Sequence, residues 1–337
     1  MKTVGFFNNK GGVGKTSVVF HLAWKYVDQG YRVLAADLDP QSNLTAMFLD
    51  ESRLEDLWCD DDDRRASVFG ALQPLIQATG DIRPWPCEEV HDRLRLAVGD
   101  LRLASFEAKL SDQWPRCLDQ DPAAFRITSA FHRMLVEAAR AHQADIVLID
   151  VGPNLGAINR AALLAAQHLV TPLGADLFSI QGLRNLGPTL RAWRSQWRER
   201  LKKNPLATLD LPSGDMTPAG YIIVQPSLHG DKVAKAYGQW LERIPAEYWV
   251  HVLGNPDEEE APVDFEHDPH FLGILKHYRS LMPMAQEARK PIFDLTAADG
   301  ALGSHAKTAR DAGKHFDALA SRIATSIDMP LRLSPSA

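Results

Sequence analysis

Short apolar runs alternate with longer amphipathic stretches along this chain. The apolar runs are typical of buried strands and lie at residues 2–7, 33–36, 94–98, 145–150, 168–173 and 219–226. Apolar side chains at three- and four-residue spacing predict helices at 17–27, 67–78, 101–110, 131–142, 157–166, 190–203, 232–243 and 305–327. Turn formers and charged runs predict loops at 114–122, 205–218 and 254–269. The alternation predicts an α/β fold, with a doubly wound, mostly parallel sheet and helices on both faces.

A glycine-rich segment, Lys10–Thr16, lies between the first predicted strand and the first predicted helix. Its glycines allow successive backbone N–H groups to converge on a phosphate, and the helix N-terminus adds partial positive charge. Lys15 can reach the β- and γ-phosphates, and the Thr16 hydroxyl can bind Mg²⁺. A plain glycine turn with surface lysines is the alternative, but a strand and a helix flank the segment as a phosphate loop requires. The predicted nucleotide-binding residues here are Gly11, Gly12, Val13, Gly14, Lys15, Thr16 and Ser17.

Acidic residues follow two of the predicted strands. Asp37 and Asp39 come directly after the run 33–36, and Asp150 ends the run 145–150. Ligands of open α/β sheets bind at the carboxyl ends of the strands, so these carboxylates are expected beside the triphosphate. There they can organise Mg²⁺ and orient the attacking water. A capped turn is the alternative for the first pair, because Asp and Pro are ordinary turn formers.

The glycine-rich loop departs from the standard phosphate-loop pattern, because Asn9 stands where that pattern has glycine and a second lysine, Lys10, follows it. This form resembles the deviant Walker A motif of the ParA/MinD family of P-loop ATPases. The resemblance implies that Lys10 reaches across a dimer interface to the ATP of the other subunit. The string Asp37–Asn43 resembles the switch I segment of ParA proteins. It implies that Asp39 is needed for hydrolysis and that Asp37 belongs to the Mg²⁺ shell.

The strand that ends at Asp150 resembles the Walker B strand of the same family, whose aspartate supports Mg²⁺. The metal-site residues implied in this way are Thr16, Asp37 and Asp150. ParA proteins have two prolines after one intervening residue, whereas this chain has Val151-Gly152-Pro153. The stiffness of the switch II segment is therefore expected to differ. The resemblance also assigns Gln225, at the end of the run 219–226, to the adenine edge.

The resemblance extends from Met1 to about Thr325. Residues 176–183 resemble the opening of a long ParA helix that continues through 190–203, and 283–293 resemble a late ParA helix. We expect a single ATPase domain over 1–327, with insertions at about 50–92 and 204–270 and a short tail at 328–337. Because the chain starts at the phosphate-loop strand, it is expected to be like the Soj-type proteins that have no N-terminal helix-turn-helix domain.

The family resemblance also implies a function. It predicts an ATPase with ATP and Mg²⁺ as cofactors, which forms a homodimer around ATP and binds DNA non-specifically. A ParB-like or other partner protein would stimulate its weak hydrolysis and release it from DNA, so that plasmid or chromosome DNA is segregated. Such a protein is expected in the cytoplasm, associated with the nucleoid.

The charge of the chain restricts where DNA can bind. The net charge is −6, so any contact with nucleic acid requires a local basic patch. Within 190–203 the apolar stripe of Leu190, Trp193, Trp197 and Leu201 favours a core position over base stacking. Basic residues cover the rest of this helix and part of the last one, and a solvated surface is the alternative reading. The candidate DNA-binding residues are Arg191, Arg194, Arg198, Lys202, Lys203, Lys307, Arg310 and Lys314.

Two other classes are disfavoured by the sequence. Cys59, Cys87 and Cys117 form no closely spaced pair, which argues against a reductase or metal carrier that uses cysteine ligands. No run approaches the 18 apolar residues of a membrane span, and the prolines Pro330 and Pro335 interrupt the tail. Stable membrane anchoring is therefore not expected. A MinD-like switch on a membrane, or a cargo-positioning switch on a protein partner, remains the alternative function.

Overall fold

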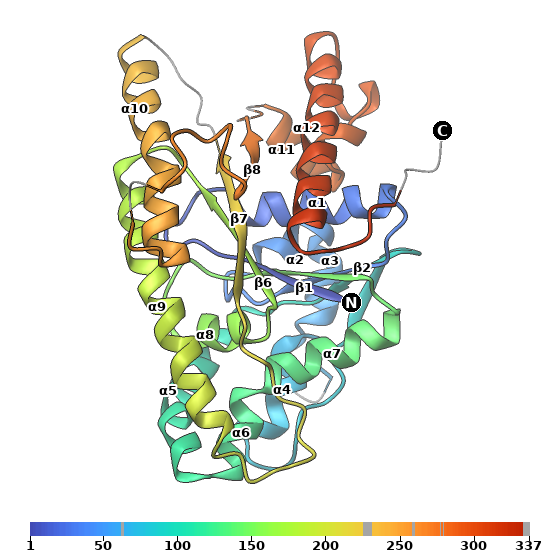
Figure 1. The fold of residues 1–337 in the computed structure, drawn as a ribbon. Helices are drawn as coiled ribbons and strands as arrows, with labels where there is room; N and C mark the ends of the chain where they lie inside the picture. Colours follow the sequence, from blue (N-terminus) through green and yellow to red (C-terminus); the bar gives the residue numbers. More distant parts are fainter. Residues whose placement is uncertain (62–63, 225–230, 258–259, 277, 279, 333–337) are drawn as a thin grey trace.

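The computed structural model describes residues 1–332 except 62–63, 225–230, 258–259, 277 and 279. Among these residues, an eight-stranded sheet in the order β3-β4-β2-β5-β1-β6-β7-β8 runs through the centre of the molecule (Figure 1). All neighbouring strands are parallel except β3 and β4. The strands are β1 (Lys2–Phe6), β2 (Val33–Asp37), β3 (Cys87–His91), β4 (Leu94–Ala97), β5 (Ile146–Asp150), β6 (His168–Leu173), β7 (Thr217–Val224) and β8 (Phe271–Leu275).

Apolar side chains alternate between the two faces of this sheet. In β2, Val33 and Ala35 belong to one hydrophobic core, whereas Leu34 and Ala36 belong to the other. Successive side chains of a strand point to opposite faces, so a strand covered on both sides needs an unbroken apolar run. This is why the short apolar runs in the sequence become central strands.

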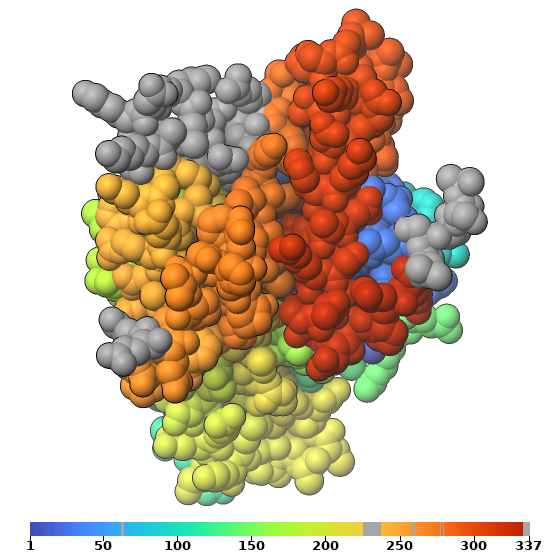
Figure 2. All heavy atoms as spheres, turned by 45° about the horizontal axis from the view of Figure 1, so that its top comes forward, coloured from blue at the N-terminus to red at the C-terminus, as the bar shows by residue number. Residues whose placement is uncertain are grey.

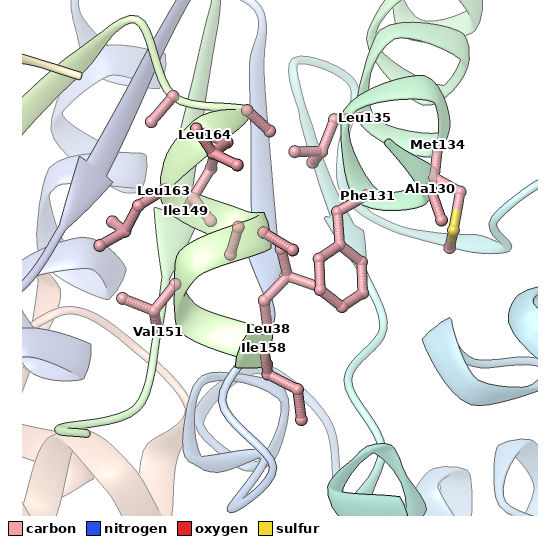
Figure 3. Close-up of a cluster of buried hydrophobic side chains, with 14 of the residues drawn as sticks. Leu38, Ala130, Phe131, Met134, Leu135, Ile149, Val151, Ile158, Leu163 and Leu164 are labelled. Carbon is pink, nitrogen blue, oxygen red and sulfur yellow. The ribbon is translucent and has the colours of Figure 1, made fainter. Parts of the chain in front are cut away.

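Helices cover both faces of the sheet, and the predicted doubly wound α/β fold is confirmed. On one face, the strands form a hydrophobic core with α1 (Lys15–Asp28), α2 (Asn43–Phe48), α11 (Leu281–Ala288) and α12 (Ser304–Ser326). On the other face, they form a second core with α4 (Val68–Ile76), α5 (Phe106–Arg116), α6 (Pro122–Thr128), α7 (Ala130–His142), α8 (Ala157–Leu164) and α9 (Leu177–Leu201). Figure 3 shows part of this second core, where Phe131 and Leu135 of α7 lie across from Leu163 and Leu164 of α8.

A third core lies beside β6, β7 and the first half of α9. It is formed by α10 (Asp231–Glu247) and the π-helical turn Tyr248–Leu253 that follows it, as seen on the left of Figure 1. The predicted insertion at 204–270 thus contains both a strand of the sheet and a helix. The insertion at 50–92 contains α3 (Glu51–Leu57), α4 and β3. Both insertions remain predictions.

The prediction of a loop at 114–122 was wrong. α5 continues to Arg116, a short 3-10 turn follows, and α6 begins at Pro122. The indole of Trp114 is buried and stacks on Trp197 of α9, with 5.8 Å between the ring centroids. This packing outweighs the turn-forming residues that predicted a loop. The expected burial of the α9 stripe is confirmed, since Leu190, Trp193 and Trp197 all belong to the core.

Candidate nucleotide-binding site

The phosphate loop connects β1 to α1, as the sequence predicts. Gly12 and Gly14 have φ angles of 73° and 75°, in the left-handed region that favours glycine. Gly14 is the N-cap of α1 and supplies no side-chain cap, so the first amides of the helix remain available to a ligand. The loop therefore has the backbone conformation that a phosphate-binding role requires.

The Lys15 side chain is held against the backbone of this loop. Its Nζ donates to the carbonyl oxygens of Asn8 at 3.3 Å and Lys10 at 3.4 Å. Burial lowers the pKa of Lys15, whereas the carboxylates of Asp150 and Asp39 act in the opposite direction. The ammonium group thus occupies a largely buried position in which an anionic ligand would be strongly favoured.

A cavity of about 610 Å³ opens over the loop, a size suited to a nucleotide. It is lined by all seven predicted nucleotide-binding residues from Gly11 to Ser17, together with Asp39, residues of α2, Pro153 and Gln286 of α11. Segments far apart in the sequence therefore meet around the loop. Gln286 had no signal in the sequence, and the predicted adenine contact Gln225 lies outside the described residues. Another cavity of about 630 Å³, between β8 and α12, shares no residue with this one.

Asp150 fits the role of a carboxylate that supports a cation. It lies at the end of β5 with no exposed surface, with the hydroxyl of Thr16 and the ammonium group of Lys15 beside its carboxylate. Burial first, and then repulsion from Asp37, raise the pKa of Asp150 well above its usual value. A bound cation would relieve both costs. No group of three metal-binding side chains occurs among the described residues, so a Mg²⁺ held by Thr16 and Asp150 would be completed by phosphate oxygens and water.

Asp37 is already engaged within the chain. Its Oδ2 accepts hydrogen bonds from the amide of Thr45 at 2.8 Å and the hydroxyl of Thr45 at 2.7 Å, and its Oδ1 accepts from the amide of Asp39 at 3.2 Å. Burial raises the pKa of Asp37 to about 7 despite these bonds. The contacts show a carboxylate that anchors α2 and the Asp39 turn. A role of Asp37 in the metal shell remains a prediction.

Asp39 lies at the wall of the cavity, where the segments after β2 and β5 meet. Its Oδ1 accepts the amide of Gln41 at 3.0 Å. A Cβ atom placed on Gly152 would lie 3.2 Å from the same oxygen. The glycine that replaces the expected proline therefore allows the Asp39 carboxylate to approach the backbone of the segment after β5.

Lys10 is not among the residues that line the cavity of its own chain. Its Nζ forms an ion pair with Asp176, at the N-cap of α9, at 2.5 Å, and lies 5.7 Å from the centre of the Phe178 ring. Phe178 itself is 71% exposed. Lys10 is therefore on the surface beside an uncovered aromatic side chain, in a position from which it could contact a second molecule.

The candidate DNA-binding residues fall into two groups. In α9, Arg191 donates to the carbonyl of His251 at 2.6 Å and Arg194 to that of Met216 at 2.9 Å, so both side chains bind their own chain. Arg198 in α9, and Lys202 and Lys203 just after its end, are exposed. In α12, the residues Lys307, Arg310 and Lys314 are all exposed and make no ion pair with the part of the chain that the structure describes. Figure 2 shows α12 in red as a ridge on the outer surface.

Comparison with known proteins relates this chain to a family of AAA domains and to proteins that include a chromosome-partitioning ATPase. A family model described as an AAA domain matches residues 1–203. Protein IncC of Escherichia coli is 29% identical over 196 residues, which cover 58% of this chain and 47% of that protein. The chromosome-partitioning ATPase Soj of Thermus thermophilus is 31% identical over 204 residues, which cover 60% of this chain and 66% of that protein. The match thus spans about half the length of IncC.

Solved structures show that the likeness of fold extends over the whole chain. Protein DIP2308 from Corynebacterium diphtheriae has a TM-score of 0.70 at 22% identity, with 97% of this chain and 99% of that chain covered. A putative plasmid partition protein from Borrelia burgdorferi, bound to AMPPNP, has a TM-score of 0.58 at 18% identity over the same shares. No described helix is long and apolar enough to cross a membrane.

Proposed function

Since the chain belongs to the ParA/MinD family of P-loop ATPases, we propose that it is a partition or positioning ATPase that binds ATP with Mg²⁺, dimerises around the nucleotide, and leaves DNA on hydrolysis. The observation that carries the proposal is the cavity in which the phosphate loop faces Asp39 while the buried Asp150 lies behind it. Such an arrangement combines phosphate binding with carboxylates for the metal and the attacking water.

The residues of the cavity have separate tasks in this proposal. Lys15 and the backbone amides of Gly11–Thr16 neutralise the phosphates. Thr16 and Asp150 hold the Mg²⁺, which when bound supplies charge neutralisation on the phosphate oxygens. Asp39, whose carboxylate lies at the cavity wall, orients the attacking water. The Asp37 contacts with Thr45 keep the Asp39 turn in place.

The surface around Lys10 supports a dimer that depends on ATP. Leu177 and Phe178, adjacent residues at the start of α9, are 47% and 71% exposed. Phe178 contacts Lys10. An exposed apolar side chain therefore lies beside the lysine that the family motif assigns to the ATP of the other subunit. A second copy on this surface would cover the apolar side chains and bring Lys10 to the nucleotide of its partner.

Binding to DNA is the next step of the proposal, and the exposed basic residues of α12 support it. Lys307, Arg310 and Lys314 are spaced by three and four residues, so they share one side of the helix. Contacts of lysine and arginine with phosphates give affinity without sequence preference and with strong salt dependence. A ParB-like or other protein partner would then trigger hydrolysis and release.

Turnover of ATP by the purified chain tests the catalytic part of this proposal. We expect slow, Mg²⁺-dependent release of phosphate, because catalytic sets of switch ATPases are completed by a partner. Asp39→Ala should bind ATP with the affinity of the wild type but lose turnover. Equal turnover of the two proteins would remove Asp39 from its role, and failure of the wild type to bind ATP would remove the proposed function.

A further inference from the structure

The segment Val151–Gly156, which connects β5 to α8 and forms one wall of the cavity through Pro153, lacks the first proline of the family motif. Something else must define its conformation, because glycine at position 152 adds backbone freedom. The two ends of the segment are fixed by packing, since Val151 and Ile158 are buried in the core that Figure 3 shows. Between these ends, Pro153 lines the nucleotide cavity and Gly152 lies beside the carboxylate of Asp39.

Asn159 of α8 holds the middle of this segment. Its Nδ2 donates to the carbonyl oxygens of Gly152 at 2.8 Å and Asn154 at 2.6 Å. The side chain is 1% exposed, and a Cβ atom on Gly152 would lie 3.6 Å from Nδ2 and 3.2 Å from Asp39 Oδ1. Asn159, Gly152 and Asp39 therefore converge at one point beside the nucleotide cavity.

Glu107 of α5 holds the end of the same segment. Its Oε1 accepts the amide of Ala157 at 2.5 Å and its Oε2 accepts the amide of Ile158 at 2.8 Å, so the carboxylate caps the N-terminus of α8. A Cβ atom on Gly156 would lie 2.6 Å from Oε1 and 2.8 Å from Asn154 Oδ1, so it would displace the carboxylate from its present position. The helix receives no cap from its own N-cap residue.

We propose that Glu107 and Asn159 are positioning residues that hold the segment Val151–Gly156 against Asp39, in place of the proline that this chain lacks. Glu107 fixes the start of α8. Asn159, in the first turn of that helix, donates its side-chain amide to the carbonyl oxygens of the segment. The catalytic consequence rests on the proposed function, because the segment faces the carboxylate that orients water. The clamp itself is a property of the nucleotide-free chain.

The exchange of backbone amides tests the clamp without any use of ATP. In Glu107→Gln, we expect the amides of residues 156–159 to exchange roughly tenfold faster than in the wild type, because a charge-assisted hydrogen bond is lost. The amides of residues 15–20 in α1 should be unchanged. Glu137→Gln, at an exposed position of α7, is the matched control and should leave both regions unchanged. Equal exchange at 156–159 in Glu107→Gln and wild type would overturn the clamp.

Kinetics then separate positioning from general stability. Glu107→Gln and Asn159→Ala should lower kcat for ATP roughly tenfold while the Kd of ATP stays within about twofold, because the phosphate-loop contacts are independent of the clamp. Asn185→Ala, at an exposed position of α9, is the control for Asn159. Gly156→Ala should reproduce the effect of Glu107→Gln, and the double variant should show no additional loss.

The two proposals fail in different ways. Faster exchange in Glu107→Gln together with no ATP turnover in the wild type would keep the clamp and reject the proposed ATPase. Normal turnover in the wild type with unchanged exchange and unchanged kcat in Glu107→Gln would reject the clamp and keep the ATPase. If Asn159→Ala does not fold, the Glu107→Gln and Gly156→Ala pair still decides the question.

Discussion

Lys10 Nζ lies 2.5 Å from Asp176 Oδ2, so the lysine that the family motif assigns to a partner's ATP is bound within its own chain. The other oxygen of Asp176 accepts the amide of Ser179 at 2.9 Å and caps α9. Burial raises the pKa of Asp176, but the hydrogen bonds from Lys10 and Ser179 more than offset it and lower this pKa overall. Movement of Lys10 to a second subunit must therefore break an ion pair.

Asp176→Asn should favour the ATP-dependent dimer. Asparagine keeps the helix cap but removes the charge that holds Lys10. The ion pair is about one-third exposed on both sides, so its loss is worth roughly 1 kcal/mol or less, which corresponds to a few-fold tighter dimerisation. Sedimentation analysis of the protein with a non-hydrolysable ATP analogue measures this. A dimer dissociation constant equal to or higher than that of the wild type would argue against a restraining role of Asp176.

Gly152→Ala should slow ATP turnover without preventing ATP binding. The added methyl group would lie 3.2 Å from Asp39 Oδ1, so the carboxylate must move by a few tenths of an ångström. Displacements of this size in a group that orients water reduce the rate more than the affinity, and we expect a loss of roughly three- to tenfold in kcat. Single-turnover hydrolysis with a parallel ATP titration is the measurement. An unchanged kcat would show that the contact with Gly152 does not constrain Asp39.

Arg194 of α9 and the exposed basic residues of α12 should behave differently. Replacing Lys307, Arg310 and Lys314 with alanine should weaken DNA binding and reduce the slope of log K against log[salt] by roughly 0.9 for each lost phosphate contact, with little change in Tm. A DNA affinity insensitive to the α12 substitutions would place the DNA-binding surface elsewhere.

Arg194→Ala should instead lower the free energy of unfolding by about 1–2 kcal/mol, because the guanidinium binds the carbonyl of Met216.

Asp37 should make the nucleotide-free protein less stable as the pH rises. Its pKa in the folded chain is about 7, above the ordinary value of an aspartate, so the folded state binds more protons than the unfolded state between about pH 4 and pH 7. The protonated form of Asp37 contributes to the free energy of unfolding at low pH. This contribution, on the order of 2–4 kcal/mol, is lost as the pH rises through 7.

Asp37→Asn removes this titration and provides the comparison for that prediction. The difference in unfolding free energy between variant and wild type should increase in favour of the variant from pH 5 to pH 8. The altered contacts with Thr45 change the unfolding free energy by a constant amount, and a constant does not affect how the difference varies with pH. Denaturant titrations at several pH values measure it, and parallel pH profiles of the two proteins would contradict the raised pKa.

The elements that carry the nucleotide site could be predicted from local sequence. A loop with Gly12 and Gly14 at left-handed φ, between an apolar strand and a helix, is determined by neighbouring residues. The same holds for Asp39 and Asp150, because each directly follows a buried apolar run. The carboxyl ends of parallel strands meet at one edge, so the topology alone brings these side chains together.

The features that were missed depend on contacts between distant segments. Nothing near Glu107 in the sequence indicates that it caps α8, because its partner amides are 50 and 51 residues away. β3 was missed because its residues Cys87–His91 are mostly polar and lie at the antiparallel edge of the sheet. The helical character of 114–116 depends on the packing of Trp114 against α9, which no local pattern records.

The central claim is that ATP converts this chain into a dimer that binds DNA. The most direct test measures DNA binding of the wild type and of Lys10→Ala with ATP, with ADP and without nucleotide, at two salt concentrations. We predict that only the wild type with ATP binds, and that its affinity falls steeply at the higher salt concentration. DNA binding that is independent of nucleotide, or equal in Lys10→Ala and the wild type, would contradict the proposed ATP-dependent dimer on DNA.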